Sequence, residues 1–306
     1  MLAAVVHDLK SAPRYGEFPE PVAQEGEQIV RVRAAALSNL VKARASGKHY
    51  SSAAELPLVP GYDGVGTLAD GRRVYFFGPR APFGSMAQLC PAKQLVELPQ
   101  GLDDATGAAL GNPGMASWGA LLGRARMQPG QTVLVNGATG VAGQQAVQAA
   151  RHLLAGRIVV TGRNRAVLDS LGADEAIWLE QPDEALLAAF RQLDVDIVLD
   201  YLWGHSAQLL LQALAGKTSR TRFVQIGSSS GATLSLEAHQ LRSSGLELVG
   251  SGLGSLSEDE IAGALRQMFD AAADLRIEVE TVDLSEVERA WGATESGRRL
   301  VFRVPA

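Results

Sequence analysis

Cysteine is scarce in this sequence, and its scarcity restricts the chemistry available to the chain. Cys90 is the single cysteine among 306 residues. One cysteine excludes an internal disulfide and any metal site built from several cysteine ligands. The five histidines show no spacing typical of metal ligands, and we find no Ser–His–Asp arrangement that indicates a serine hydrolase. We therefore expect no bound metal and no serine hydrolase.

Long apolar runs and an excess of positive charge are also absent. No stretch approaches the roughly 20 apolar residues that a helix needs to cross a bilayer. The N-terminal residues MLAAVVHDLK are too few, and reach charged residues too soon, for a signal peptide. The net charge of −5 argues against a nucleic-acid partner. We expect a cytoplasmic protein with no membrane and no nucleic-acid partner, and a 46% hydrophobic composition that is ample for two packed domains.

A glycine turn is the most informative feature that the chain does have. Residues 131–143 read QTVLVNGATGVAG, a short apolar strand that runs directly into three spaced glycines. Such a strand–turn–helix lets backbone N–H groups meet a pyrophosphate at a helix N-terminus. A tight turn in an α/β domain without nucleotide is the alternative interpretation. We assign to pyrophosphate contact and close helix–strand packing Gly137, Ala138, Thr139, Gly140, Val141 and Gly143.

The residues after this turn indicate which dinucleotide is bound. A site that prefers NAD usually places a carboxylate about twenty residues further on, where it holds the ribose 2′-hydroxyl. No Asp or Glu occurs between Gly137 and Val167, and Arg163 stands at that place. Because arginine pairs bidentately with phosphate, we assign Gly162, Arg163 and Asn164 to the 2′-phosphate of NADPH. A surface arginine that begins a helix is the alternative for Arg163.

Strand and helix signals alternate from Gln131 onward. Near-continuous apolar strands separated by helices predict a parallel sheet covered on both faces, and six of them fit a doubly wound dinucleotide-binding sheet. The expected helices include 141–154 and 183–193. The expected strands are Thr132–Val135, Arg157–Thr161, Glu175–Leu179, Asp196–Tyr201, Arg222–Ile226 and Leu246–Gly250.

The first 112 residues read differently, with short alternating strands, many prolines and glycines, and a hairpin from Val65 to Phe77 across Asp70–Gly71. The tail has a helical stretch at 258–273 and strand-like stretches at 277–282 and 300–304, which have no place in the parallel sheet. We expect the tail to return to the β-rich part. The predicted domains are thus 1–112 with 257–306, and a nucleotide-binding domain at 113–256 inserted between them.

Taken together, the motifs of the chain resemble those of the medium-chain dehydrogenase/reductase superfamily, and most closely its zinc-free, NADPH-dependent quinone oxidoreductase branch. The resemblance covers essentially the whole chain. It implies a Rossmann sheet inserted in a β-rich, GroES-like catalytic domain. The motifs that carry it are 60–66 (PGYDGVG), 112–118 (NPGMASW), the glycine turn, 171–174 (LGAD), 196–201 (DIVLDY) and 223–227 (FVQIG).

Two departures from zinc-dependent members of the superfamily select the chemistry. Those members carry a catalytic cysteine where this chain has Ala35–Ser38, and a His–Glu pair where it has Tyr62–Asp63. Without a Lewis acid, the enzyme suits acceptors that are already electrophilic, namely quinones and α,β-unsaturated carbonyls. Hydride addition to these gives a delocalised anion that a few hydrogen bonds can stabilise.

The resemblance also implies residues near the nicotinamide and the substrate. It places Gly227, Ser228, Leu253 and Gly254 along the ribose and nicotinamide, and it makes Asn39, Tyr50 and Tyr62 candidates for the catalytic site. Counting back from Gly47 without a gap puts Ser38 at the usual asparagine position, so Asn39 could be an ordinary loop residue. Tyr50 could pack with its hydroxyl in water, and Tyr62 could simply fill the emptied metal pocket.

The sequence thus predicts a zinc-independent oxidoreductase that transfers a hydride from NADPH to a small-molecule quinone or enone. A reductase of enoyl or acryloyl thioesters on the same fold is one alternative. An NADPH-binding sensor or scaffold with little turnover is another, because Ala116 replaces a hydroxyl that relatives often have. We also expect a homodimer, since the apolar segment 246–250 is the predicted last strand of the sheet and relatives often dimerise there.

Overall fold

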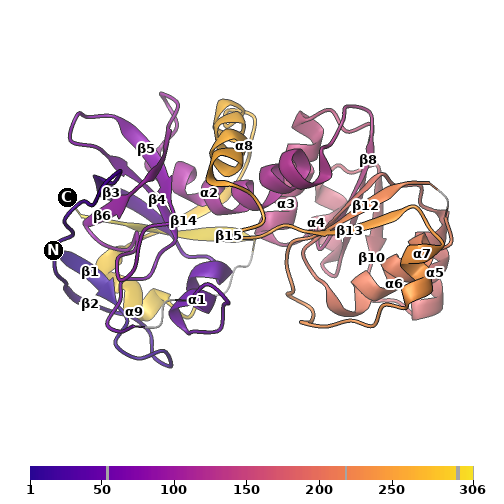
Figure 1. The fold of residues 1–306 in the computed structure, drawn as a ribbon, viewed down its shortest axis with the longest axis horizontal. Coiled ribbons are helices and arrows are strands. Elements are labelled where there is room, and N and C mark those ends of the chain that lie inside the picture. The colour runs from indigo at the N-terminus through magenta and orange to yellow at the C-terminus, as the bar shows by residue number, and fades with distance from the viewer. Residues whose placement is uncertain (53–54, 218, 294–296, 306) are drawn as a thin grey trace. The chain divides into compact units, whose positions relative to one another are not determined.

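The computed structural model describes residues 1–52, 55–217, 219–293 and 297–305, and they form two compact units (Figure 1). The first unit consists of Met1–Asn112 together with Leu265–Ala306, and the second of Pro113–Ala264. The first limit coincides with the expected domain boundary, whereas the second falls inside a helix, α8 (Glu258–Asp270), rather than before it. That each unit is a separate functional domain stays a prediction.

The first unit is built mainly from short strands. Its strands are β1 (Leu2–Val5), β2 (Arg14–Glu17), β3 (Gln28–Ala36), β4 (Asp63–Thr67), β5 (Arg73–Phe77), β6 (Leu89–Ala92), β7 (Gln94–Glu97), β14 (Glu278–Asp283) and β15 (Arg298–Arg303). Its helical segments are α1 (Asn39–Ala45), the 3₁₀ turn at Leu284–Glu286 and α9 (Val287–Ala290), while α2 (Asp104–Gly119) and α8 each run across a limit between the units.

Within the described residues, seven strands of this unit form one mixed sheet in the order β14-β15-β3-β4-β5-β7, with β6 paired to β3. The predicted hairpin is present as antiparallel β4 and β5. The tail joins the same sheet, because β15 pairs antiparallel with β3 and β14 pairs parallel with β15. The alternating strands bury one large apolar cluster, whose members include Val30, Val32 and Phe76.

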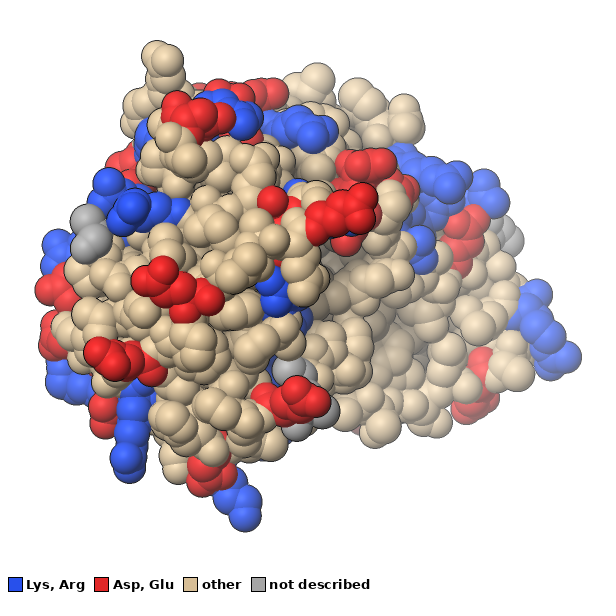
Figure 2. All heavy atoms as spheres, turned by 60° about the vertical axis from the view of Figure 1, so that its left-hand side comes forward, with Lys and Arg blue, Asp and Glu red and all other residues tan. Residues whose placement is uncertain are grey.

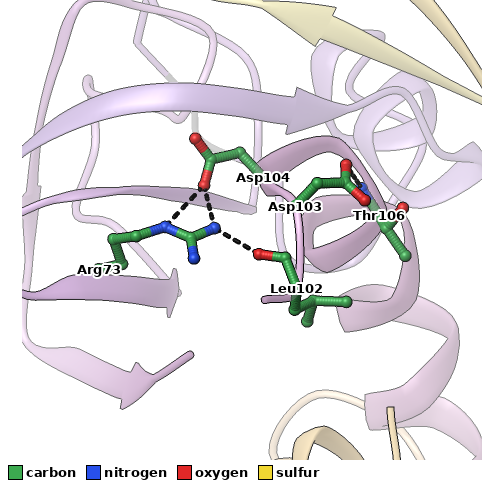
Figure 3. A network of polar contacts seen from close by, with 5 residues as sticks. All are labelled: Arg73, Leu102, Asp103, Asp104 and Thr106. Carbon is green, nitrogen blue, oxygen red and sulfur yellow. Dashed lines mark hydrogen bonds and ion pairs between the residues drawn. The ribbon is translucent and has the colours of Figure 1, made fainter. Parts of the chain in front are cut away.

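The start of α2 is tied to the sheet by a polar network (Figure 3). Arg73, the first residue of β5, donates from Nε and Nη2 to Asp104 Oδ1 at 3.1 and 2.5 Å, and from Nη2 to the carbonyl of Leu102. Asp103 Oδ1 accepts the N–H of Thr106 at 2.9 Å, which satisfies one of the free donors at the helix start. These bonds attach the first turn of α2 to strand β5.

The second unit alternates strands and helices along its whole length. Its strands are β8 (Thr132–Asn136), β9 (Arg157–Gly162), β10 (Glu175–Trp178), β11 (Ile197–Asp200), β12 (Thr221–Gln225) and β13 (Leu246–Gly250). Its helices are the π-helical segment Ala120–Ala125, α3 (Val141–His152), α4 (Arg165–Ser170), α5 (Asp183–Gln192), α6 (Gly204–Leu214) and α7 (Ala238–Arg242).

The six strands pair in parallel in the order β10-β9-β8-β11-β12-β13, which is the doubly wound order of a dinucleotide-binding sheet. Right-handed crossovers then place α3 and α4 on one face and α5, α6 and α7 on the other, and Figure 1 shows the last three together beside the sheet. Strand order reverses between β8 and β11, so their carboxyl ends open the crevice in which such folds bind ligands. The predicted fold class is confirmed.

Charged residues of both signs are interspersed on the face shown in Figure 2, without a broad field of one sign. None of the helices among the described residues is long and apolar enough to span a membrane.

Candidate functional site

The glycine turn joins β8 to α3 and leaves the helix start open. Gly137 adopts φ of +93°, a left-handed conformation suited to glycine, and the N–H groups of Gly137 and Ala138 donate to the Thr161 carbonyl at 3.2 and 2.8 Å. These two N–H groups therefore fasten the turn to β9. Gly140 is the N-cap of α3 and has no side chain to cap the helix. The N–H groups of the first helical turn, at 141–143, have no partner within the helix and are available to an anion.

Two glycines of the turn differ in what surrounds them. A Cβ on Gly143 would collide with the carbonyl oxygen of Gly137 and lie 2.7 Å from Ala138 Cα, so this position needs glycine for the fold itself. A Cβ on Gly140 would meet no atom closer than 3.9 Å. The space beside Gly140 is thus free of protein, as expected where backbone must approach a pyrophosphate.

A buried polar network lies directly beneath this turn and connects three strand ends. Asn136 Nδ2 donates to Asp200 Oδ1 at 2.8 Å and to Ser206 Oγ at 3.1 Å, and Asn136 Oδ1 accepts the Thr161 hydroxyl at 2.6 Å. Asp200 also accepts backbone N–H groups of Leu202 and Trp203. Burial raises the pKa of Asp200 to about 6, although the amide of Asn136 and these N–H groups act in the opposite direction.

This network went unnoticed at the level of sequence, although its members adjoin recognised motifs. Asn136 directly precedes Gly137, and Asp200 is the second-last residue of the expected strand 196–201. Because β8, β9 and β11 are neighbours only through the sheet order, no local pattern indicates that these side chains meet. They hold the carboxyl edge of the sheet in one geometry.

The tip of β9 presents two arginines to solvent. Arg163 and Arg165 are exposed, the Arg163 carbonyl accepts the Trp178 indole N–H at 2.9 Å, and the Arg165 guanidinium lies 5.9 Å from the Trp178 ring centre. Asn164 is the N-cap of α4, and its side chain accepts the N–H of Val167 at 3.3 Å. A cap therefore engages the Asn164 side chain, which leaves the two arginines as the cationic groups beside the turn.

The remaining cofactor candidates lie at the ends of β12 and β13. Gly227 donates its N–H to the Asp200 carbonyl at 3.0 Å, and a Cβ there would lie 2.6 Å from the Tyr201 carbonyl oxygen. Ser228 follows it at the carboxyl edge. Leu253 and Gly254 lie in the turn after β13, where Gly254 adopts φ of +90°. These positions fit the assigned contacts, which remain a prediction.

The substrate candidates of the first unit lie around α1. Ser38, not Asn39, is the buried residue here, and its hydroxyl accepts the Val41 N–H as the N-cap of the helix. Asn39 is the exposed first residue of α1. Tyr50 is 75% exposed and its ring stacks on His49 with centroids 4.1 Å apart. The structure therefore brings neither Asn39 nor Tyr50 into an enclosed site within this unit.

Tyr62 lines a small hollow, and Arg44, which the sequence analysis did not single out, lies against the Tyr62 ring. The guanidinium of Arg44 is 5.0 Å from the centre of the Tyr62 ring, and both side chains are half-buried. The lining is otherwise apolar and comes from α1, from the segment before β4 and from the loop after β5: Val41, Ala45, Leu58, Val59, Pro60, Gly61, Pro79, Ala81, Pro82 and Phe83. Arg44 carries no sequence signal beyond being a basic residue in a mostly apolar helix.

Asp63, beside Tyr62, is buried in the sheet. Its Oδ2 accepts the hydroxyl of Tyr75 at 2.8 Å, and its Oδ1 has no hydrogen-bond partner among the described residues. Burial raises the pKa of Asp63 to about 6, although the Tyr75 hydroxyl and the positive charge of Arg299 lower it in part. Asp63 thus resists ionisation in the fold.

Replacing Asp63 with asparagine should remove a pH dependence of stability. Because its folded pKa is raised from 3.8 to about 6, the native protein loses stability as the pH rises from about 4 to about 6, by up to about 3 kcal/mol. Asparagine keeps an acceptor for Tyr75 and does not ionise. In urea unfolding, the free energy of unfolding of Asp63→Asn should increase relative to that of the wild type as the pH rises over this range. If the difference in unfolding free energy between variant and wild type stayed constant, or changed in the opposite direction, Asp63 would be ionised in the folded protein over this pH range.

Within the part of the chain that the structure describes, no three His, Cys, Asp or Glu side chains are grouped so as to hold a metal ion. The positions that carry ligands in zinc-dependent dehydrogenases are instead occupied by residues with other contacts. Ser38 caps α1, Tyr62 lies under Arg44, and Asp63 accepts from Tyr75.

The fold and the glycine turn define a nucleotide-dependent dehydrogenase or reductase, and comparisons with known proteins agree. No protein-family model matches the chain. A probable NADPH-dependent quinone reductase of Emericella nidulans is 26% identical, and the alignment covers 100% of both chains. The 2-methylene-furan-3-one reductase of Solanum lycopersicum is 32% identical over 51% of this chain and 46% of its own length. The quinone oxidoreductase of Thermus thermophilus, also crystallised with NADPH, has a TM-score of 0.81 and 26% identity over 99% of this chain and 100% of that one.

A larger protein contains a similar segment. A mycocerosic acid synthase-like polyketide synthase of Mycobacterium tuberculosis is 30% identical over 79% of this chain, which spans 12% of the synthase. The quinone and enone reductases among these relatives and structural neighbours are members of the zinc-free branch of the medium-chain dehydrogenase/reductase superfamily, and this chain is similar to them. The resemblance noted in the sequence is thereby confirmed.

Proposed function

We propose that the protein is an NADPH-dependent reductase of quinones and activated α,β-unsaturated carbonyls. The single observation that carries this is the uncapped N-terminus of α3 at the glycine turn, with two exposed arginines and no carboxylate at the tip of the next strand. A dinucleotide with an extra phosphate matches that charge arrangement. Of the relatives named above, one is a probable NADPH-dependent quinone reductase and one a 2-methylene-furan-3-one reductase, and both names indicate acceptors that are already electrophilic.

The residues present fit the cofactor. The N–H groups at 141–143 would bind the pyrophosphate, the open space at Gly140 would let the backbone approach it, and Arg163 with Arg165 would bind the 2′-phosphate. When bound, NADPH would supply a hydride to the electron-poor carbon of the acceptor, and a proton from water or a phenol would complete the reduction, so that NADPH, acceptor and H⁺ give NADP⁺ and reduced acceptor.

The chain's own contribution is binding and orientation. Holding the acceptor in a reactive geometry contributes about 7 to 11 kcal/mol at best. The Asn136–Asp200 network keeps the sheet edge rigid, so that groups bound there do not shift. Tyr62 and Tyr50 are the phenols that could deliver a proton, and Tyr62 is the one that lines an apolar hollow.

A panel of quinones, enones and enoyl thioesters, followed by loss of NADPH absorbance, tests the proposal. Turnover of quinones or enones supports it, whereas preference for thioesters would point to the second candidate, which the polyketide synthase relative favours. Tight NADPH binding with no oxidation by any acceptor would instead indicate a sensor or scaffold.

We further propose a homodimer that forms through β13. This strand is the last in the order of the parallel sheet, so its outer backbone groups are left for another strand. Light scattering that gave a monomer mass would remove the idea. The cytoplasm is the proposed compartment, consistent with a single cysteine and therefore no internal disulfide.

A further inference from the structure

We propose that Arg44 is an anion-binding residue and that the acceptor of this enzyme carries a carboxylate or a similar anionic group, which enters the hollow beside Tyr62. The inference deepens the proposed function by naming the substrate class. It rests on the contacts of one arginine, on the absence of a compensating charge among the described residues, and on the shape of the hollow.

The first observation is how the Arg44 side chain is held. Its guanidinium lies over the Tyr62 ring at 5.0 Å, and its Nη1 donates to Ser51 Oγ at 3.3 Å. His49 Nδ1 lies 2.8 Å from the same hydroxyl. Ring and hydroxyl position the guanidinium and leave most of its five donors unused by these two contacts. Held in this way, Arg44 loses little conformational freedom when a planar anion binds.

The second observation is a contrast between two arginines that both contact residues of the hollow. Arg80 lies 5.2 Å from the centre of the Phe83 ring, but its Nε donates to Glu27 Oε1 at 2.9 Å. Arg44 has no such partner: among the described residues, no Asp or Glu forms an ion pair with it. Removing a charge from water without a counter-ion is costly, and an anionic ligand would offset that cost.

The titratable groups around Arg44 do not supply a negative charge that would compensate its positive charge. Burial lowers the pKa of Arg44, while the Tyr62 and Tyr50 hydroxyls raise it in part. Burial and the nearby Arg44 charge lower the pKa of His49, so that this ring is neutral near pH 7. The hollow therefore presents one cation in a mostly apolar wall.

The third observation is size. The hollow has a volume of about 40 Å³, and a single water needs roughly 10–15 Å³ of such space. There is room for about three water-sized groups, so a group as small as a carboxylate fits. The apolar walls would then contact the carbon skeleton next to it, while Arg44 pairs bidentately with the oxygens.

A matched pair of acceptors tests the proposal. Benzoylacrylate and its methyl ester share one activated C=C bond and differ in charge. Arg44→Gln should raise the KM for benzoylacrylate by about 10- to 100-fold, at least tenfold more than it raises the KM for the ester. Arg44→Lys should recover part of this loss, because it keeps the charge. Arg14→Gln, which removes an exposed arginine of β2 outside the hollow, is the control and should leave both values unchanged.

A binding measurement without NADPH separates this inference from the proposed function. Benzoylpropanoate, the saturated analogue, cannot be reduced, and calorimetry should detect its binding to wild type and a loss of at least tenfold in Arg44→Gln. If no acceptor oxidises NADPH but benzoylpropanoate binds through Arg44, the proposed function fails and the anion site stands. Equal effects of Arg44→Gln on anion and ester, or no dependence of benzoylpropanoate binding on Arg44, would overturn the inference.

Discussion

Gly143→Ala should both destabilise the protein and disable its use of NADPH. The added Cβ would collide with the Gly137 carbonyl oxygen and lie 2.7 Å from Ala138 Cα, so the turn or α3 must move. Overpacking of this kind costs about 1–3 kcal/mol. A displacement of about 1 Å at a reacting geometry costs on the order of 100-fold in rate. Thermal unfolding and kcat/KM for NADPH measure the two effects.

Gly140→Ala is the matched control, because it adds the same methyl group to the same turn. Its Cβ would meet no protein atom within 3.9 Å, and the backbone at φ −80° accepts alanine. Stability should therefore stay at the wild-type level, while NADPH binding weakens because the methyl group takes up space next to the pyrophosphate. If Gly140→Ala bound NADPH normally, the pyrophosphate would lie elsewhere. If Gly143→Ala behaved as wild type in both measurements, the close packing of α3 against the turn would be wrong.

Arg163→Asp should convert the cofactor preference. An arginine that pairs with the 2′-phosphate contributes charge-assisted hydrogen bonds worth about 1.5–3 kcal/mol each, and aspartate adds repulsion. We expect KM for NADPH to rise on the order of 100-fold, and KM for NADH to change little, since NADH lacks that phosphate. Steady-state kinetics with both cofactors give the ratio.

The control for this prediction is Arg191→Asp, which reverses the charge of an exposed arginine in α5. α5 belongs to the opposite face of the sheet from α4, so its charge should not distinguish the two cofactors. Equal small changes of both KM values in Arg163→Asp would remove the assignment of the 2′-phosphate to Arg163. Arg165→Asp would then be the next variant, because its side chain lies on Trp178 at the same tip.

The nucleotide unit could be predicted almost strand by strand, for a physical reason. Strands of a parallel sheet are buried on both faces, so each appears in the sequence as a short continuous apolar run. The expected strands 132–135 and 246–250 correspond to β8 and β13 within one residue. The glycine turn could also be predicted from the sequence, because only glycine suits the left-handed backbone conformation at Gly137 and the close packing at Gly143.

Other features depend on contacts that no local pattern records. α2 contains Pro113 and crosses from one unit to the other, so its helical character was not evident in the sequence. In the tail, β14 pairs in parallel with β15, and β15 in turn pairs with β3, which lies far away in the chain. Local sequence does not indicate such distant pairing. Asn164 caps α4 with its side-chain oxygen, which no motif indicated, and its assignment to the 2′-phosphate stays a prediction.

The substrate side shows the same limit. Ser38 and Asn39 are neighbours, and only the helix start decides that the first is buried as a cap and the second exposed. Nothing in the sequence singles out Arg44, because its proposed role depends on its contacts with Tyr62 and Ser51 and on the lack of an ion-pair partner among the residues that the structure describes. A local motif can indicate which cofactor is bound. The groups that recognise a substrate come from separate segments that only the fold brings together.

The most direct test of the account follows the hydrogen itself. Chelator-treated protein is incubated with methyl benzoylacrylate and NADPH deuterated at the transferring position of nicotinamide C4, and the product is analysed by mass spectrometry and NMR. The account predicts one deuterium on a carbon of the former double bond and full activity without added metal. A reduced product without deuterium, activity that returns only with a metal ion, or NADPH that binds but reduces no acceptor would contradict it.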